Sequence, residues 1–252
     1  MSFGLIVPQG WREDLPGRDF EVMVTVAQAA ERLGFESIWL YDHLQTRDGD
    51  RDALFECWTT LAALARETSR VRLGQIVTCA LYRNPGLLAQ MAATLDAASR
   101  GRLIVGVGAG WDEREFREFG YGEALPSVGN RLRQLERTLK VLRARQRSPI
   151  LVGGGGEKVL LRLVAQYADL CNFTDSFDPA FYRHKLDVLR RHCNAVGRDY
   201  DSIRKTASFT VADGVDFAAL RRAGIEDFIV YLDPPTDLGL LEAFARRTGV
   251  ER

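Results

Sequence analysis

The stretch SPILVGGGGEKVLLRLVAQYADLCNF, from Ser148 to Phe173, contains two short apolar runs separated by glycines and an amphipathic segment. The apolar runs Pro149–Gly153 and Ala168–Phe173 have the length and composition of buried strands, and Glu157–Tyr167 has the pattern of a helix. Parallel strands need a crossover connection, which is usually a helix. This stretch therefore predicts one strand–helix unit of a parallel sheet.

The same alternation of a short apolar run and a longer amphipathic run continues along the whole chain. Strands are expected at Phe3–Val7, Ser37–Asp42, Val71–Thr78, Arg102–Gly108, Pro149–Gly153, Ala168–Phe173, Lys205–Val211 and Glu226–Leu232. Helices are expected at Phe20–Leu33, Phe55–Glu67, Pro85–Ala98, from Asp112, and at Arg131–Arg143, Glu157–Tyr167, Pro179–Val196, Asp216–Ala223 and Asp237–Arg246.

These alternating runs predict the class of fold. Strands this apolar, each followed by a helix, indicate a parallel sheet that is covered on both faces. Eight such units in 252 residues fit the typical size of a closed (β/α)8 barrel, or TIM barrel. An open doubly wound sheet is the alternative. Because no linker rich in Pro, Gly or Ser interrupts the chain, we expect one α/β barrel domain over residues 1–252, compact and with few insertions.

Composition narrows the possible partners and the compartment. The chain has 34 basic and 34 acidic residues, which argues against a broad nucleic-acid or membrane-surface footprint. Neither a membrane-spanning apolar run nor a signal-type N-terminus is found, so a cytoplasmic protein without a membrane partner is expected. None of the four cysteines lies in a Cys-x-x-Cys pair, which is typical of reduced thiols in an intracellular protein.

The glycine run Gly153–Gly156 predicts a binding site for an anion. A strand followed by glycines and a helix exposes backbone N–H groups at the positive end of the helix, which suits a phosphate. The run does not match known nucleotide loops, because Lys158 precedes Val159 instead of Ser or Thr and the last glycine of G-x-G-x-x-G is missing. A purely structural tight turn is the alternative.

A second glycine cluster, GVGAGW, runs from Gly106 to Trp111. Alternation along a strand places Gly106, Gly108 and Gly110 on one face. Such a face can form a flat floor for a planar ligand, or it can allow close packing inside a crowded barrel. The sequence leaves both interpretations open.

The motif YDHL places Asp42 and His43 at the carboxyl end of an expected strand, where a barrel keeps its chemistry. An imidazole exchanges protons near neutral pH, so His43 is the candidate general acid or base. The other histidines, His184 and His192, lie on a helix that is expected to face solvent. No spacing typical of metal ligands and no G-x-S-x-G motif is found, so neither a metal site nor a serine hydrolase is expected.

Taken together, these motifs resemble a known family. GFESIWLYDHL, LGQIVTCALYRNP, GVGAGWDEREFREFGYG and the stretch from Ser148 to Phe173 are similar, in this order, to segments of the luciferase-like monooxygenase superfamily. They look most like its branch of F420-dependent oxidoreductases, and the resemblance extends from Phe3 to about Leu232. It implies a (β/α)8 barrel that binds a flavin or the deazaflavin coenzyme F420 at the carboxyl ends of its strands, and a homodimer.

The resemblance also implies roles for individual residues around the cofactor ring. Asp42 and His43 would lie beside the ring, with His43 as the acid/base group. Thr78 and Cys79 would lie at the end of the third strand, where members of the family bulge beneath the ring and often contain a non-proline cis peptide. The segment Gly108, Ala109 and Gly110 would contact the ring or the ribityl chain.

The cofactor phosphate would be held, by the same resemblance, through backbone amides at a helix start. The residues implied are Gly155, Gly156, Lys158 and Val159.

Two features of the chain depart from the family pattern. Many members carry a hairpin insertion before the strand that begins at Pro149, whereas here helix and strand are joined directly. Trp111 stands where the sugar-phosphate dehydrogenases of the family place a catalytic glutamate. Oxidation of a sugar phosphate is therefore not expected, and a hydrophobic substrate is.

The resulting expectation is an enzyme that transfers a hydride between F420 and a small, hydrophobic organic molecule. An FMN-dependent monooxygenase or reductase is the first alternative, because both cofactors carry a phosphate at the same end of the ribityl chain. A cofactor-binding protein without turnover, and a barrel enzyme that acts on a phosphorylated sugar without redox chemistry, are further alternatives.

Overall fold

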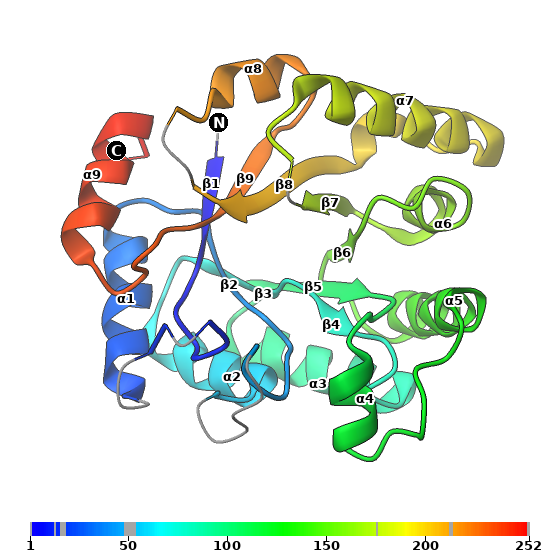
Figure 1. Ribbon diagram of the computed structural model, residues 1–252, viewed down its shortest axis with the longest axis horizontal. Helices are drawn as coiled ribbons and strands as arrows, with labels where there is room; N and C mark the ends of the chain where they lie inside the picture. The colour runs from blue at the N-terminus through cyan, green and yellow to red at the C-terminus, as the bar shows by residue number, and fades with distance from the viewer. Residues whose placement is uncertain are drawn as a thin grey trace.

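The strands close into a barrel within the residues that the computed structural model of the chain describes, which are 2–12, 14–15, 19–47, 54–174, 176–211 and 214–250. In these ranges the parallel strands follow the order β3-β2-β1-β9-β8-β7-β6-β5-β4, and an additional pairing of β3 with β5 closes the sheet. The helices lie outside it (Figure 1). Because β3 and β4 occupy one position between β2 and β5, the barrel has eight positions, which confirms the predicted TIM barrel.

The bounds of the elements follow the expected alternation. The strands are β1 Ser2–Ile6, β2 Ser37–Leu40, β3 Arg72–Gln75, β4 Thr78–Cys79, β5 Leu103–Gly108, β6 Ile150–Gly153, β7 Leu170–Thr174, β8 Arg204–Thr210 and β9 Asp227–Tyr231. The α-helices are α1 Phe20–Arg32, α2 Cys57–Glu67, α3 Pro85–Ala98, α4 Glu113–Glu118, α5 Val128–Arg145, α6 Leu160–Tyr167, α7 Pro179–Val196, α8 Phe217–Arg222 and α9 Leu238–Thr248.

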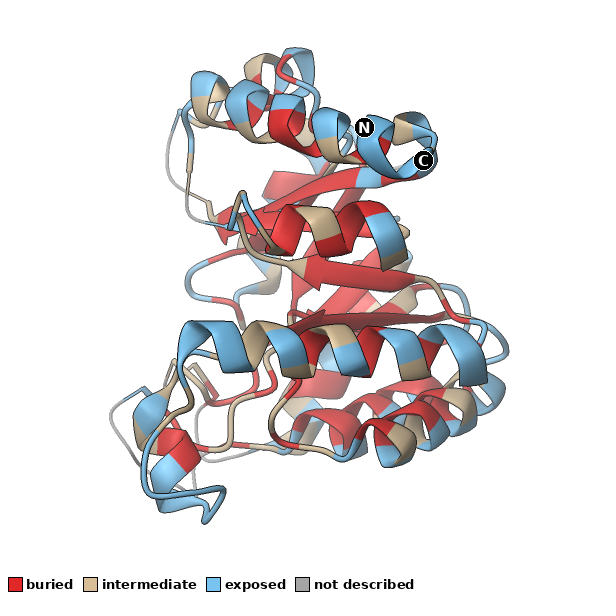
Figure 2. Cartoon of the chain, turned by 90° about the vertical axis from the view of Figure 1, so that its right-hand side faces the viewer, coloured by how far each residue is buried: buried red, intermediate tan, exposed pale blue. Residues whose placement is uncertain are grey.

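The apolar side chains form two layers. A large cluster fills the space between the strands and the helices, and a smaller one, which includes Trp39, Ile104 and Leu151, fills the barrel interior. Figure 2 shows the strands buried along their length, whereas the helices are buried mainly on one side. Strands buried on both faces explain the continuous apolar runs in the sequence. Among the described residues, no helix combines the length and the apolar character needed to cross a membrane.

The third strand differs from the continuous strand that was predicted at Val71–Thr78. It is divided into β3 and β4, with a cis peptide bond between Ile76 and Val77, and both pieces pair with β5. Gly106 in β5 permits this path, because a Cβ atom at that position would lie 1.8 Å from the carbonyl oxygen of Gln75. Any larger residue there would force the two strands apart.

Two expected helices begin two or three residues later than predicted, for different reasons. Helix α2 begins at Cys57 because the side chain of Glu56 accepts hydrogen bonds from the backbone nitrogens of Trp58 and Thr59, which makes it the N-cap. Helix α6 begins at Leu160, because the three residues after the glycine run form a turn. The direct connection between α5 and β6 agrees with the sequence, since only four residues separate Arg145 from Ile150.

Glu31, near the end of α1, fastens the loop before β3. Its carboxylate accepts hydrogen bonds from the backbone nitrogens of Ser69, Arg70 and Val71, at 2.9, 2.6 and 2.8 Å for the Oε2 atom. Burial on its own would raise the pKa of Glu31, but these hydrogen bonds lower it from 4.5 to about 2. The charged carboxylate therefore stabilises the fold.

We expect Glu31→Gln to reduce the free energy of unfolding at neutral pH and to have less effect in acid. The pKa of Glu31 is lower in the folded state, so its contribution is complete above 4.5 and is lost as the pH falls toward about 2. Urea denaturation of both proteins between about pH 7 and pH 3 measures the difference, with Glu21→Gln on the exposed face of α1 as control. A difference that does not change with pH would contradict this assignment.

Candidate active site

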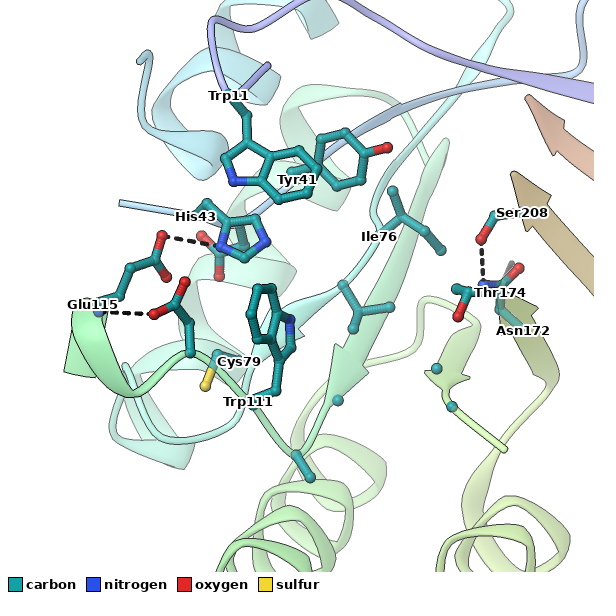
Figure 3. A pocket seen from close by; sticks show the side chains of 18 of the residues that line it. Trp11, Tyr41, His43, Ile76, Cys79, Trp111, Glu115, Asn172, Thr174 and Ser208 are labelled. Atoms are coloured by element: carbon teal, nitrogen blue, oxygen red, sulfur yellow. Dashed lines mark hydrogen bonds and ion pairs between the residues drawn. The ribbon is translucent and has the colours of Figure 1, made fainter. Parts of the chain in front are cut away.

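A cavity of about 420 Å³ opens at the carboxyl ends of the strands. Residues from or just after β1, β2, β4, β5, β6, β7 and β8 line it, so it lies where a TIM barrel keeps its chemistry. Six of the eleven residues expected to bind the cofactor or exchange a proton line this cavity: Asp42, His43, Cys79, Gly108, Ala109 and Gly110. Figure 3 shows His43 on the same side of the cavity as two tryptophans.

His43 is held on two sides by aromatic rings and on a third by a carboxylate. The indole of Trp11 stacks on the imidazole, with ring centroids 4.4 Å apart and an interplanar angle of 3°. Trp111 meets the imidazole edge to face at 5.6 Å. The Nδ1 atom lies 3.0 Å from Oε1 of Glu115. Since an ionised carboxylate only accepts hydrogen bonds, Nδ1 carries the proton, and the second ring nitrogen, Nε2, is left to exchange a proton with a ligand.

Glu115 is a site residue that the sequence analysis missed. It lies on α4 and is 1% exposed, and besides His43 it accepts hydrogen bonds from the Leu44 nitrogen (3.0 Å) and the Tyr82 hydroxyl (2.8 Å). Burial on its own would raise the pKa of Glu115, but the hydrogen bond and charge of His43, together with Tyr82 and Leu44, lower it. The site therefore contains a buried, ionised carboxylate that orients His43.

A local signal for Glu115 exists, although it points to another role. The residues Asp112 to Glu115 have the D-x-x-E spacing of a capping box, and Asp112 does accept a hydrogen bond from the Glu115 nitrogen at 3.0 Å. The glutamate side chain, however, turns toward His43, which lies 72 residues earlier in the chain. Only the fold brings these two groups together.

Asp42 is engaged by an arginine. Nη1 and Nη2 of Arg83 lie 2.5 and 3.0 Å from the two carboxylate oxygens of Asp42, and the same guanidinium contacts Glu56 at 2.8 Å. Burial raises the pKa of Asp42, and Arg83 opposes this effect. Thr78 lies just outside the cavity lining, where its hydroxyl accepts a hydrogen bond from Nε1 of Trp58 at 3.0 Å. Both residues thus support the wall beside His43.

The glycines of β5 and β6 make room for Val77. A Cβ atom on Gly108 would lie 2.6 Å from one methyl carbon of Val77, and a Cβ atom on Gly153 would lie 2.9 Å from the other. Of the two interpretations left open by the sequence, close packing therefore explains Gly108. At this position the cavity is lined by Ile76 and Val77 as well as by Gly108.

The glycine run leads from the cavity to the start of α6. Gly153 and Gly154 line the cavity, whereas Gly155, Gly156, Lys158 and Val159 follow in the next turn and lie outside its lining. Helix α6 has no hydrogen bond from an N-cap side chain; in its first turn the Leu161 nitrogen donates to the Gly156 carbonyl oxygen at 3.0 Å, and within the described residues the Leu160 and Arg162 nitrogens remain for another acceptor. The eight other α-helices bounded above each have such a cap: Asp19, Glu56, Asn84, Asp112, Ser127, Asp178, Asp216 and Asp237.

Lys185 of α7 lies beside this turn. Its Nζ atom would be 3.9 Å from a Cβ atom on Gly155, and it makes an ion pair with Glu157 at 2.6 Å. The side chain is only 16% exposed. A cation, a flexible glycine backbone and an uncapped helix start therefore meet at one point, a combination that suits a phosphate.

The fold also groups His43, Asp112 and Glu115, whose possible ligand atoms lie within 4.8 Å of one another. The sequence showed no metal-ligand spacing, because the histidine and the carboxylates belong to different elements. Hydrogen bonds account for the grouping: Glu115 contacts His43, and Asp112 caps α4. We therefore interpret this cluster as a hydrogen-bonded acid/base pair with its supporting cap.

The opposite wall of the cavity is polar. Nδ2 of Asn172 donates to the Ser208 hydroxyl at 2.8 Å (Figure 3). The Thr206 hydroxyl, behind the lining, donates to Oδ1 of Asn172 at 2.8 Å. Strands β7 and β8 thus present a fixed row of hydrogen-bonding groups across from His43 and its aromatic neighbours.

Comparison with known proteins identifies relatives of this barrel. The family model for luciferase-like monooxygenases matches residues 1–249. The F420-dependent hydroxymycolic acid dehydrogenase of Mycobacterium tuberculosis is 30% identical over 233 residues, which cover 82% of this chain and 63% of the relative. The F420-dependent glucose-6-phosphate dehydrogenase of Microbacterium testaceum is 28% identical, with coverage of 69% and 59%. The chain thus spans about three fifths of the length of these two relatives.

Solved structures share the fold at lower identity. An F420-dependent secondary alcohol dehydrogenase in complex with an F420-acetone adduct superposes with a TM-score of 0.81 at 17% identity, over 100% of this chain and 99% of the other. The coenzyme F420-dependent tetrahydromethanopterin reductase of Methanopyrus kandleri gives 0.76 at 17% identity, with 97% coverage of both chains. The family match, which takes in nearly every residue of the barrel, shows that the chain belongs to the luciferase-like monooxygenase family.

Proposed function

We propose that the protein is an F420-dependent oxidoreductase that transfers a hydride between the deazaflavin and a small organic substrate with a hydrophobic body. The observation that carries this proposal is the His43–Glu115 pair, which places an oriented proton-exchanging imidazole in the wall of the barrel cavity. Two relatives named as F420-dependent enzymes, and two F420-dependent enzymes of the same fold, support it.

The residues of the cavity fit such a cofactor. Ile76 and Val77 offer an apolar surface to a planar ring, and the row around Asn172 and Ser208 offers hydrogen bonds to a polar chain. The uncapped start of α6, with Gly155, Gly156, Lys158 and Val159, would hold the phosphate through backbone amides, and Lys185 would add a positive charge. Asp42, Thr78, Cys79 and the segment from Gly108 to Gly110 would frame the ring.

The chemistry divides between cofactor and protein. When bound, F420 supplies or accepts the hydride at C5 of its ring. His43 handles the proton: Nε2 gives it to the oxygen of a carbonyl substrate that is being reduced, or takes it from an alcohol that is being oxidised. Glu115 keeps the proton on Nδ1 and stabilises the positive charge of the doubly protonated imidazole. The indoles of Trp11 and Trp111 exclude water from one side of this exchange.

A hydrophobic substrate is also part of this proposal. Trp111 lies at the cavity rim, 66% exposed, and Trp11 and Tyr41 line the cavity beside it. Aromatic walls of this kind favour an apolar body over a sugar phosphate.

We further propose that the barrel acts as one domain in a cytoplasmic homodimer. The four unpaired cysteine thiols and the exposed Leu87 and Val128, on the neighbouring helices α3 and α5, support this.

The proposal is tested by titrating the purified protein with F420, FMN and FAD in parallel and following ligand fluorescence. We expect saturable binding of F420, and weaker binding of the F420 fragment that ends at the ribityl chain, because it lacks the phosphate. Reduced F420 should then be oxidised in the presence of an aromatic ketone. Binding of FMN alone would instead indicate a flavin-dependent enzyme, and binding of none of the three would overturn the proposal.

A further inference from the structure

Arg12 is a cation in the wall of the cavity that the proton exchange does not use. The ends of three strands hold its guanidinium. Nη1 donates to the Thr210 hydroxyl at 2.8 Å, Nη2 donates to the Tyr41 hydroxyl at 3.4 Å, and Cζ lies 4.5 Å from the ring centroid of Tyr231. These contacts keep the charged group at the mouth of the barrel, where it lines the cavity.

The charge of Arg12 has no counter-ion in the described part of the chain. Asp14 accepts hydrogen bonds from the Gly10 nitrogen (2.6 Å) and the Tyr231 hydroxyl (3.1 Å), and it makes no ion pair with Arg12. The Nε atom of Arg12 is buried and has no hydrogen-bond partner. A half-buried cation without a counter-ion and a buried N–H donor without an acceptor both cost free energy unless a partner is bound, so Arg12 is poised for an anionic partner.

The place of Arg12 relative to His43 indicates the shape of this partner. Both groups lie against one indole: the Trp11 ring centroid lies 4.4 Å from that of His43 and 5.3 Å from Cζ of Arg12. A molecule that reaches both groups must therefore pass along an aromatic surface. Its reacting oxygen would lie at His43, its apolar part against Trp11 and Tyr41, and its anionic group at Arg12.

We propose that the substrate is an amphiphilic carbonyl compound, or the corresponding alcohol, whose carboxylate is bound by Arg12. An arginine fork binds a carboxylate through two parallel hydrogen bonds, which also sets its orientation. The aromatic neighbours keep water away and strengthen this pair. The assignment of the carbonyl to His43 rests on the proposed hydride transfer, whereas the binding of an anion at Arg12 does not.

Two matched ketones test this assignment. 3-Benzoylpropionate carries a carboxylate where butyrophenone carries a methyl group, and the rest of the two molecules is the same. Their affinities are measured by calorimetry with the protein bound to oxidised F420, which has no hydride to give, and again with the protein alone. We expect 3-benzoylpropionate to bind about 10- to 100-fold more tightly, and the advantage to decrease at high salt.

Substitutions then show which cation binds the carboxylate of 3-benzoylpropionate. Arg12→Met, which keeps an unbranched apolar chain, should reduce the ratio of the two affinities to about one, and Arg12→Lys should restore part of it. Arg47→Met is the matched control, because Arg47 also lies over the indole of Trp11, at 5.7 Å, but is exposed and outside the cavity lining. It should leave the ratio unchanged.

Three results would overturn the proposal. The first is equal affinity of the wild type for the two ketones, or no measurable binding of 3-benzoylpropionate. The second is an unchanged ratio in Arg12→Met. The third is a loss of F420 affinity in Arg12→Met, because the anion at Arg12 would then be the cofactor tail. If F420 itself does not bind, the proposed function fails, and the calorimetry with the cofactor-free protein still decides whether Arg12 binds a carboxylate.

Discussion

Replacing His43 with asparagine is expected to reduce the rate of hydride transfer from F420 to a ketone by about 10²- to 10⁴-fold, the usual contribution of a positioned acid or base. Asparagine keeps a polar side chain of similar size but has no group that exchanges a proton near neutral pH. The affinity for F420 should change little, because we propose that other residues hold its phosphate and its ring. Stopped-flow measurement of a single turnover separates the two effects.

The exposed His184 supplies the control for this substitution. Its side chain is 60% exposed, so His184→Asn should transfer the hydride at the wild-type rate. A His43→Asn protein that keeps the wild-type rate would show that another group moves the proton. A protein that loses F420 affinity and rate together would show that His43 serves chiefly to bind the cofactor.

Glu115 is expected to affect stability and rate together. Glu115→Ala removes the acceptor of four hydrogen bonds, from His43, Tyr82 and the backbone nitrogens of Leu44 and Gln45. Each buried donor without a partner costs about 1–3 kcal/mol, so the free energy of unfolding should decrease by about 3 kcal/mol or more. Glu115→Gln fills the same space, so its free energy of unfolding should be higher than that of Glu115→Ala. It should still lower the rate about 10- to 100-fold, because it no longer orients a charged imidazole.

The pH dependence of unfolding separates the stabilisation that comes from the charge of Glu115 from the stabilisation that comes from the space its side chain fills. Its pKa is lowered in the folded state, so the ionised carboxylate stabilises the protein above its ordinary pKa and loses this effect as the pH falls. The difference between wild type and Glu115→Gln should therefore decrease in acid. Glu113→Ala, at an exposed position of the same helix, is the control and should change neither property. A constant difference at all pH values would contradict an ionised Glu115.

The order of strands and helices was predictable because the same alternation of apolar and amphipathic runs repeats along the chain. Eight apolar runs, each followed by an amphipathic run, specify eight strand–helix units, and the barrel confirms this. The element bounds that were predicted wrongly lie where contacts with an adjacent segment change the structure that the local pattern favours. The strand expected at Val71–Thr78 is divided, because Gly106 of the adjacent strand allows Gln75 to approach. Helix α6 begins at Leu160, three residues after the start that its periodicity indicated.

The candidate site was predictable only in part. His43 could be found because it directly follows a strand, and strand ends determine the position of the site in a barrel. Glu115 carries no such mark, because it lies on a short helix, and the mark is weaker for Trp11 and Arg12, which lie several residues beyond the end of β1. Their importance arises from contacts with His43 and with the ends of strands β2, β8 and β9.

By itself, the sequence determines the strands, the helices and the end of the barrel at which the site lies, because these depend on hydrophobic periodicity and chain direction, which are local properties. Only the tertiary structure decides which side chains meet there. It brings Glu115 to His43 across 72 residues, fills the space above Gly108 with Val77, and leaves Arg12 in the cavity wall without a described counter-ion. Such contacts depend on packing between distant segments, for which a linear pattern contains no signal.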